Sequence, residues 1–304
     1  MPADGRFRHE ALLYAGDDDF AARVGSFVVD GLARDEPVLV LVEARKHRLL
    51  RDALGADATR VTFADMTDVG HNPARIIPAW TSFVRDTTRE GRRARGVGEP
   101  VWPGRSPEEL VECHIHESLI NRAFAGAAMS LVCPYDVGAL DPSAVDEARR
   151  NHPHVVGAGG RVTSEEYTLD GAPGPLAAPP RNAARFDYDA SQLRALRDFV
   201  GVRAEASHVS LRARETLVWV ANELATNSIR HGGGAGSLTL WRSGDRVVCE
   251  VTDRGWIRDP LVGRVEPAEE RESGRGVWLA NQLCDLVQIR TTPNGTTVRV
   301  HLAG

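Results

Sequence analysis

A run of prolines and small residues between positions 171 and 180 divides this chain of 304 residues. It contains four prolines, and proline lacks the backbone N–H that helices and central strands need. Because the run also shows no hydrophobic periodicity, it is typical of a semi-stiff linker rather than of a helix or a buried strand. We therefore expect two domains, at residues 7–168 and 186–304, joined by a Pro/Gly/Ala-rich linker at 169–185.

Before the linker, strand and helix signals alternate. The run 37–42 is continuously apolar, which suits a strand buried on both faces of a sheet. The predicted elements are strand 11–14, helix 20–33, strand 37–42, helix 49–54, strand 61–63, helices 78–88 and 108–124, and strand 129–133. This alternation favours a three-layer α/β domain with a mostly parallel sheet. The loop after the first strand lacks a phosphate-binding Gly-x-x-x-x-Gly-Lys-(Ser/Thr) motif, so no catalysis is expected in this half.

After the linker, helices are followed by strands that pair with one another. The predicted elements are helices 191–202 and 211–230, strands 237–241 and 247–252, helix 276–286, and strands 288–291 and 297–302. The dipeptide Asn294-Gly295 is a strong hairpin-turn signal. Val247, Cys249 and Val251 would point inward from their strand. Helices segregated from an antiparallel sheet predict an α/β sandwich.

Charge and hydropathy argue against several classes of protein. The net charge of −5 leaves no basic excess to neutralise the phosphates of a nucleic acid. No apolar run is long enough to span a bilayer, and the N-terminus lacks the layout of a secretion signal. We expect a cytoplasmic protein that binds neither nucleic acid nor membrane. Its four cysteines are scattered and are expected to be free thiols in a reducing compartment.

The predicted helix 211–230 carries the strongest chemical signal. Glu223 and Asn227 are four residues apart, so they project from the same face of a helix. A carboxylate and a carboxamide placed in this way can share a water, a hydroxyl group and a magnesium ion. The neutral oxygen of Asn suits a hard cation that already carries phosphate charge, and Glu can take a proton from an attacking hydroxyl group.

Two further motifs follow downstream. Asp253 at the end of a strand can accept a hydrogen bond from the amino group of an adenine, and Gly255 lets the backbone approach the ring. Gly274 and Gly276 flank Arg275 at a helix start, where free backbone N–H groups can bind an anion. Each motif alone is more often an ordinary helix face, turn or helix entry, so it is their order that favours a nucleotide site.

The order of these three motifs resembles the GHKL ATP-binding domain, or Bergerat fold, that is shared by gyrase, Hsp90, histidine kinases and anti-sigma serine kinases. The segments Asn227 to Gly232 and Gly274 to Asp285 narrow the resemblance to the RsbW-like anti-sigma kinases. The resemblance covers roughly residue 186 to the C-terminus and implies that ATP and Mg²⁺ are the cofactors.

The resemblance also implies a role for each matching residue. Glu223 would be the general base, Asn227 the Mg²⁺ ligand and Asp253 the residue that reads adenine. The nucleotide pocket would be shaped by Gly255, Gly274 and Gly276, while Arg275 touches the phosphates. The segment 261–273 would be a lid over them.

The implied function is control of an alternative sigma factor, as in a stress response. The chain would phosphorylate a Ser or Thr of an anti-anti-sigma (STAS) partner and sequester the sigma factor, and the resemblance allows a homodimer.

One alternative is a non-catalytic ATP-binding module that only sequesters its partner. Another is a sensor histidine kinase, for which His9 and His208 are the candidate acceptors, although neither lies in a His-(Asp/Glu)-x-x-x-Pro context.

Polar residues of the N-terminal half cluster within 95–102, 112–121, 133–136 and 152–153. This pattern resembles the MEDS sensory domain of prokaryotic signalling proteins, which implies a RecA- or KaiC-like sheet without a P-loop and a pocket for a small hydrophobic ligand. We predict that the pocket is lined by Glu99, Trp102, Tyr135 and His152.

Two other interpretations of these residues stay open. In one of them, Glu112, Glu117 and Arg95 form a buried salt-bridge network that holds the fold together. In the other, the run from Cys113 to Glu117 supplies metal ligands, since Cys113 shares a helix face with His116 or Glu117. No second ligand pair is evident, so a zinc site is not predicted.

Overall fold

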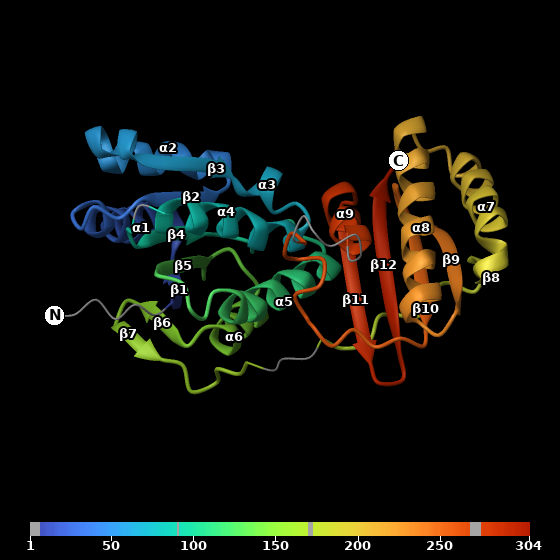
Figure 1. Cartoon of the computed structure of the whole chain (residues 1–304). Coiled ribbons are helices and arrows are strands. Elements are labelled where there is room, and N and C mark those ends of the chain that lie inside the picture. The colour runs from blue at the N-terminus through green and yellow to red at the C-terminus, as the bar shows by residue number, and fades with distance from the viewer. Residues whose placement is uncertain (1–6, 90, 170–172, 268–274) are drawn as a thin grey trace. The chain divides into compact units, whose positions relative to one another are not determined.

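The computed structural model describes residues 7–89, 91–169, 173–267 and 275–304. The chain folds into two compact units, Met1–Ala172 and Pro173–Gly304, each with its own sheet (Figure 1). None of the helices in the described ranges combines the length and the apolar character that a bilayer crossing requires.

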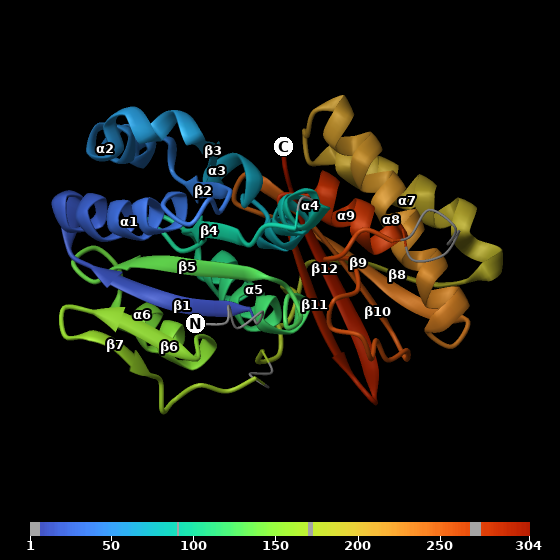
Figure 2. The same ribbon diagram turned by 60° about the vertical axis from the view of Figure 1, so that its left-hand side comes forward.

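The N-terminal unit is built on a seven-stranded sheet with the order β3-β2-β4-β5-β1-β6-β7. Its first six strands run parallel, and β7 pairs antiparallel with β6 at the edge, as Figure 2 shows. The strands are β1 (Arg8–Tyr14), β2 (Val38–Val42), β3 (Val61–Asp65), β4 (Ala94–Gly98), β5 (Met129–Asp136), β6 (His154–Gly157) and β7 (Gly160–Thr163). The predicted mostly parallel sheet is confirmed, although the sequence analysis missed β4, β6 and β7.

Helices cover both faces of this sheet. They are α1 (Gly16–Leu32), α2 (Ala44–Leu54), α3 (Met66–Val69), α4 (Ile76–Arg89), α5 (Pro107–Ala123) and α6 (Pro142–Asn151). On one face, residues of α1 and α2 pack in a core with Tyr14 and Val97. On the other face, Trp80 of α4 lies directly against the sheet, where a Cβ atom at Gly96 or Gly98 would come within 2.9 Å of its ring. Glycine at these two positions therefore lets α4 approach closely.

Local signals explain where α5 and α6 begin. Ser106 accepts a hydrogen bond from the Glu109 N–H, and the Glu109 side chain accepts from the Ser106 N–H, which forms a capping box. Asp141 caps α6 in a similar way through the Ser143 N–H. Both helices have proline in the first turn, where its missing N–H is no loss.

The C-terminal unit is an α/β sandwich, as predicted. Its antiparallel sheet has the order β11-β12-β10-β9-β8. The strands are β8 (Ala184–Asp189), β9 (Ala235–Ser243), β10 (Arg246–Asp253), β11 (Leu286–Thr292) and β12 (Gly295–Ala303), and the helices are α7 (Leu193–Ala206), α8 (Leu211–His231) and α9 (Arg275–Leu283). Val247, Cys249 and Val251 point into one core with apolar residues of all three helices, which confirms their predicted direction.

Part of the predicted linker is hydrogen-bonded to the C-terminal sheet. Arg290 donates to the carbonyl oxygen of Gly174 at 2.8 Å, and Arg299 donates to that of Ala177 at 2.6 Å. The two linker carbonyls, which belong to no helix or strand, thus each accept a charge-assisted hydrogen bond. The four cysteines are all buried, and none of them is part of a disulfide bond.

Candidate nucleotide-binding site

A cavity of about 400 Å³ opens between α8, the end of β10, α9 and β12. Its walls are largely apolar and include Val251, Val277 and Val298, and its polar groups include Asn227, Ser228 and Asp253. A volume of a few hundred Å³ with apolar walls and few polar groups is what a small organic ligand needs. The cavity therefore contains two of the side chains that the sequence analysis singled out, Asn227 and Asp253.

The first and third sequence motifs meet beside this cavity. Glu223 and Asn227 are half-buried and lie one turn apart on α8. Gly276, in the first turn of α9, is packed so closely that a Cβ atom there would lie 3.2 Å from Glu223 Oε2 and 3.2 Å from Asn227 Nδ2. The start of α9 is thus placed against the acidic and amide side chains, although Glu223 itself does not line the cavity.

Asp253 is held in the cavity wall by two short hydrogen bonds. The Ser228 hydroxyl lies 2.6 Å from Asp253 Oδ2, and the Gly255 N–H donates to Asp253 Oδ1 at 2.7 Å. The Thr296 hydroxyl donates to the Gly255 carbonyl at 2.9 Å, which fixes the turn in the same position. A carboxylate has more than two acceptor positions, so Asp253 can still accept a bond from a ligand amino group.

Two glycines let the end of α8 approach this carboxylate. A Cβ atom at Gly232 would lie 2.4 Å from Asp253 Cγ, and one at Gly255 would lie 2.8 Å from the His231 carbonyl oxygen. Neither glycine has a positive φ, so the close approach explains why a larger residue does not fit.

Comparison with known families identifies both units. Residues 8–153 match the model of the MEDS family, the methanogen/methylotroph DcmR sensory domain, and residues 186–302 match that of the histidine kinase-like ATPase domain. The C-terminal unit is a histidine kinase-like ATPase domain. The N-terminal unit is a MEDS domain.

One similar solved structure is that of the RsbU and RsbW domains of Rv1364c from Mycobacterium tuberculosis. It has 17% sequence identity and a TM-score of 0.32, and the match covers 41% of this chain and 33% of that one. The chain thus spans about a third of the length of this relative. No curated protein matches the chain.

The fit of a purine nucleotide to the ATPase domain can be judged from its own residues. The apolar walls suit a purine ring, and the Asp253 carboxylate can accept from an exocyclic amino group. Asn227 offers a neutral amide next to the Glu223 carboxylate, which suits a hydrated Mg²⁺ ion. Arg275 begins α9 and is exposed, whereas Gly274 lies outside the described residues. These residues fit ATP and Mg²⁺.

Only the first part of the predicted lid can be placed. Val262 lines the cavity, and the Gly263 carbonyl accepts a hydrogen bond from Asn281 Nδ2 at 2.8 Å. Residues 268–273 lie outside the described ranges. Val262 therefore forms part of the cavity wall, and the neighbouring Gly263 is hydrogen-bonded to α9.

Two residues of this site, and a tyrosine beside it, were not predicted from the sequence. Ser228 and Thr296 fix Asp253 and its turn, and the buried Tyr188 hydroxyl packs against Gly236 beside the same strand. Burial raises the pKa of Tyr188 to about 12. The one sequence signal for Ser228 is a small polar residue on the inward face of a helix, which is common and unspecific.

The four predicted pocket residues of the MEDS domain do not form a single group. Tyr135 and His152 contact each other edge to face, with ring centroids 5.7 Å apart. Glu99 belongs to a different cluster, where it accepts from Lys46 at 2.5 Å and from the Tyr14 hydroxyl at 2.7 Å. Burial raises the pKa of Glu99 despite these two partners. The role of the four predicted pocket residues in ligand binding stays a prediction.

Trp102, the fourth of these residues, is covered by a cation. The guanidinium of Arg105 lies 3.6 Å from the centre of the Trp102 ring. Arg105 also donates to the carbonyl oxygens of Pro100, His71 and Gly70. This Trp–Arg stack is therefore held by several backbone contacts.

The salt bridges differ from the network that the sequence suggested. Arg95 pairs with Glu36 at 2.5 Å and with Asp30 at 3.1 Å, rather than with Glu112 or Glu117. Arg95 extends from β4 toward the end of α1, where a Cβ atom at Gly31 would collide with it. The acidic residues of α5 lie on the opposite face of the sheet, with α4 and α6.

Neither candidate phospho-acceptor histidine lies on a helix. His9 is the second residue of β1 and is only 2% exposed. His208 lies in the turn between α7 and α8 with a φ of 55°.

Proposed function

We propose that this chain is an ATP- and Mg²⁺-dependent protein kinase that regulates an alternative sigma factor. It transfers the γ-phosphate to a Ser or Thr of an anti-anti-sigma partner with a STAS domain, and its ATPase domain sequesters the sigma factor when that partner is phosphorylated. The MEDS domain tunes this exchange in response to a small hydrophobic ligand. Support comes from one observation above all: Gly276 packs against both Glu223 and Asn227 beside the cavity that holds Asp253.

Each residue has a defined task in this proposal. Phosphoryl transfer depends mainly on positioning and on neutralising charge. Asn227 holds Mg²⁺, which neutralises the phosphates when it is bound. Asp253 orients the adenine ring of ATP, because its carboxylate is fixed by Ser228 and the Gly255 N–H. Glu223 lies one turn from Asn227 and accepts the proton of the attacking hydroxyl group.

A phosphotransfer assay with the full-length chain tests the proposal. The reaction contains ATP labelled on its γ-phosphate, Mg²⁺ and a purified STAS-domain protein. We expect label on a Ser or Thr of the STAS protein. Glu223→Gln should lower transfer by about 10²- to 10⁴-fold, the usual contribution of a general base, while ATP binding is kept. Asn227→Ala should weaken ATP binding only when Mg²⁺ is present.

Glu215→Gln is the matched control, because Glu215 is exposed on the same helix two turns earlier. Its transfer rate should equal that of the wild type. A stable complex with sigma factor or STAS protein and no label would support the non-catalytic module instead. Acid-labile label on the chain itself would support a histidine kinase, and either result would overturn the proposal.

A further inference from the structure

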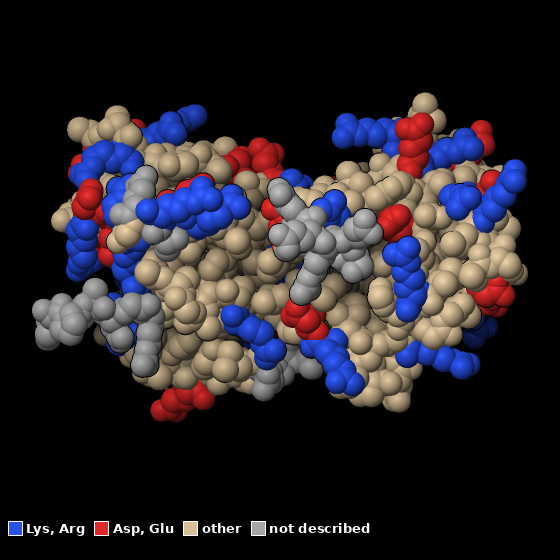
Figure 3. All heavy atoms as spheres, viewed as in Figure 1, with Lys and Arg blue, Asp and Glu red and all other residues tan. Residues whose placement is uncertain are grey.

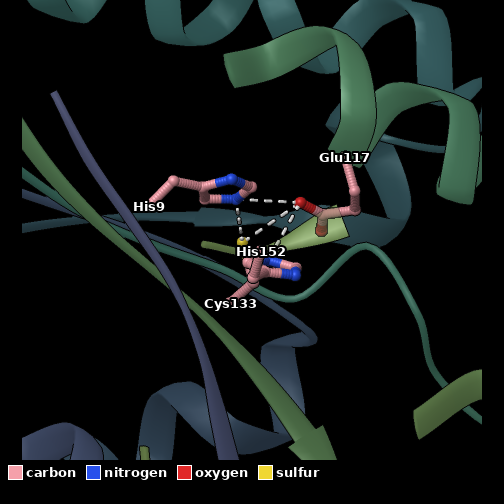
Figure 4. A group of neighbouring side chains, drawn as sticks. All are labelled: His9, Glu117, Cys133 and His152. Atoms are coloured by element: carbon pink, nitrogen blue, oxygen red, sulfur yellow. Dashed lines mark hydrogen bonds and ion pairs between the residues drawn. The ribbon is translucent and has the colours of Figure 1, made fainter. Parts of the chain in front are cut away.

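Four side chains with metal-binding atoms converge inside the MEDS domain. They are His9 from β1, Glu117 from α5, Cys133 from β5 and His152, which directly follows α6 (Figure 4). Each residue is at most 2% exposed, and one ligand atom of each lies within 4.8 Å of the other three. The run from Cys113 to Glu117 thus contributes Glu117 alone, and its partners come from distant parts of the sequence.

The separations of these atoms are close to those in a four-coordinate metal site. Glu117 Oε2 is 3.0 Å from His9 Nε2, 3.4 Å from His152 Nε2 and 3.5 Å from Cys133 Sγ. His9 Nε2 is 3.3 Å from Cys133 Sγ. Zinc bonds of about 2.0 Å to nitrogen or oxygen and about 2.3 Å to sulfur place neighbouring ligands of a tetrahedron about 3.3–3.5 Å apart. Four of the separations are close to these values, and the remaining ones are within 4.8 Å.

The outer hydrogen bonds point both imidazoles inward with a free lone pair. His152 Nδ1 lies 2.7 Å from the Ala148 carbonyl, which can only accept, so Nδ1 carries the proton. Asn121 Nδ2 donates to the carbonyls of Glu117 and Asn151, which directs Asn121 Oδ1 toward His9 Nδ1 at 3.0 Å. His9 Nδ1 therefore also carries a proton. Such outer bonds are typical of metal-bound histidines.

Without a cation, this arrangement leaves one buried nitrogen atom without a hydrogen bond. Among the described residues, the buried His152 Nε2 has no hydrogen-bond partner, although it faces Glu117. The Glu117 carboxylate is completely buried beside these two imidazoles, with its Oε2 3.0 Å from His9 Nε2 and 3.4 Å from His152 Nε2. An ionised group buried among neutral partners is costly.

A divalent ion would remove this imbalance. Figure 3 shows Lys, Arg, Asp and Glu side chains spread over one face of the molecule, whereas Glu117 is completely buried. One carboxylate, one thiolate and two neutral imidazoles carry two negative charges, which a divalent cation balances. We propose that His9, Glu117, Cys133 and His152 bind one Zn²⁺ ion. Two imidazoles with one sulfur and one oxygen ligand in a tetrahedral arrangement suit Zn²⁺ among the divalent metals.

Metal content of the full-length protein gives the first test. The protein is purified without chelators, incubated with Zn²⁺, desalted and analysed by mass spectrometry of its metals. We expect one Zn²⁺ per chain and its loss in Cys133→Ser and His152→Gln. Cys113→Ser is the matched control, since Cys113 is also a buried thiol of the MEDS domain, but its sulfur faces the Pro100 carbonyl. The control should keep its zinc, and wild-type protein with only trace metal would overturn the proposal.

Cobalt substitution separates loss of a ligand from loss of the fold. Co²⁺ in a site with one thiolate gives a sulfur-to-cobalt charge-transfer band and strong ligand-field bands in four-coordinate geometry. Cys133→Ser should lose the charge-transfer band while the far-ultraviolet circular dichroism is unchanged, and Cys113→Ser should keep the band. The same charge-transfer band in Cys133→Ser would assign the sulfur to another cysteine and overturn the proposed ligand set. None of these readouts depends on nucleotide binding or phosphotransfer.

Discussion

Replacing Gly232 with alanine tests how Asp253 is positioned. The backbone of Gly232, with φ −103° and ψ 15°, is accessible to alanine, so the effect comes from the added methyl group alone. That Cβ atom would lie 2.4 Å from Asp253 Cγ, whereas ordinary contacts begin at 3.4 Å. The carboxylate or the end of α8 must therefore move by about 1 Å. Such a shift lengthens the bonds of 2.6 Å to Ser228 and 2.7 Å to Gly255.

The expected size of the effect follows from these contacts. A hydrogen bond to a charged group contributes about 1.5–3 kcal/mol, so misplacing Asp253 should weaken ATP binding by about 10- to 100-fold. Overpacking should also lower the free energy of unfolding by about 1–3 kcal/mol. Titration calorimetry with ATP and Mg²⁺, at a temperature where both proteins are folded, measures the first effect. Urea denaturation measures the second.

Gly201→Ala is the control for this experiment. Gly201 lies within α7 of the same unit, and the nearest side-chain atoms to an added Cβ are 3.8 Å away. It should bind ATP like the wild type and be slightly more stable, since alanine favours a helix. Unchanged ATP affinity in folded Gly232→Ala would refute the reasoning about Asp253. Lack of ATP binding by the wild-type protein would instead refute the proposed function.

Three further predictions concern stability, measured by urea denaturation of the full chain. Since burial raises the pKa of Tyr188 to about 12 from its ordinary 10, the contribution of this tyrosine to the free energy of unfolding should hold below pH 10 and fall toward pH 12, by at most about 3 kcal/mol. Tyr188→Phe should therefore make the decline of the free energy of unfolding over this pH range shallower. Lys46→Met should cost about 3–5 kcal/mol because it leaves the buried Glu99 without its cation, and adding Glu99→Leu should recover most of the loss. Gly96→Ala should cost about 1–3 kcal/mol, because three side chains lie within 3.0 Å of the new methyl group, while Gly126→Ala meets nothing within 4 Å and should be neutral.

The ATPase domain could be predicted well because its signals are local. The four-residue spacing of Glu223 and Asn227 fixes their common face as soon as α8 forms. Asp253 comes at the end of a strand with clear alternation, so its position at the end of β10 follows from the sequence. The bond from Ser228 to Asp253 could not be predicted, since it depends on how closely α8 crosses β10, and Gly232 sets that distance.

Strand β4 was not predicted, for a different reason. The sequence of β4 contains Gly96, Gly98 and Arg95, which have little preference for a strand. It becomes a strand because β2 and β5 on either side satisfy its backbone groups, and because glycine leaves room for Trp80. Tertiary packing decides this element, and a single sequence does not report it.

The predicted sensory pocket shows how much the two faces of a sheet matter. The predicted pocket groups polar residues from separate segments of the N-terminal half, but the side chains of a strand leave its sheet on two opposite faces. His9 and Tyr14 are five residues apart on β1, so their side chains leave opposite faces. Tyr14 draws Glu99 to the side of α1 and α2, while His9 meets Cys133 on the side of α5. Whether two polar residues can share a site therefore depends on the face of the sheet from which their side chains project, as well as on their positions along the strands.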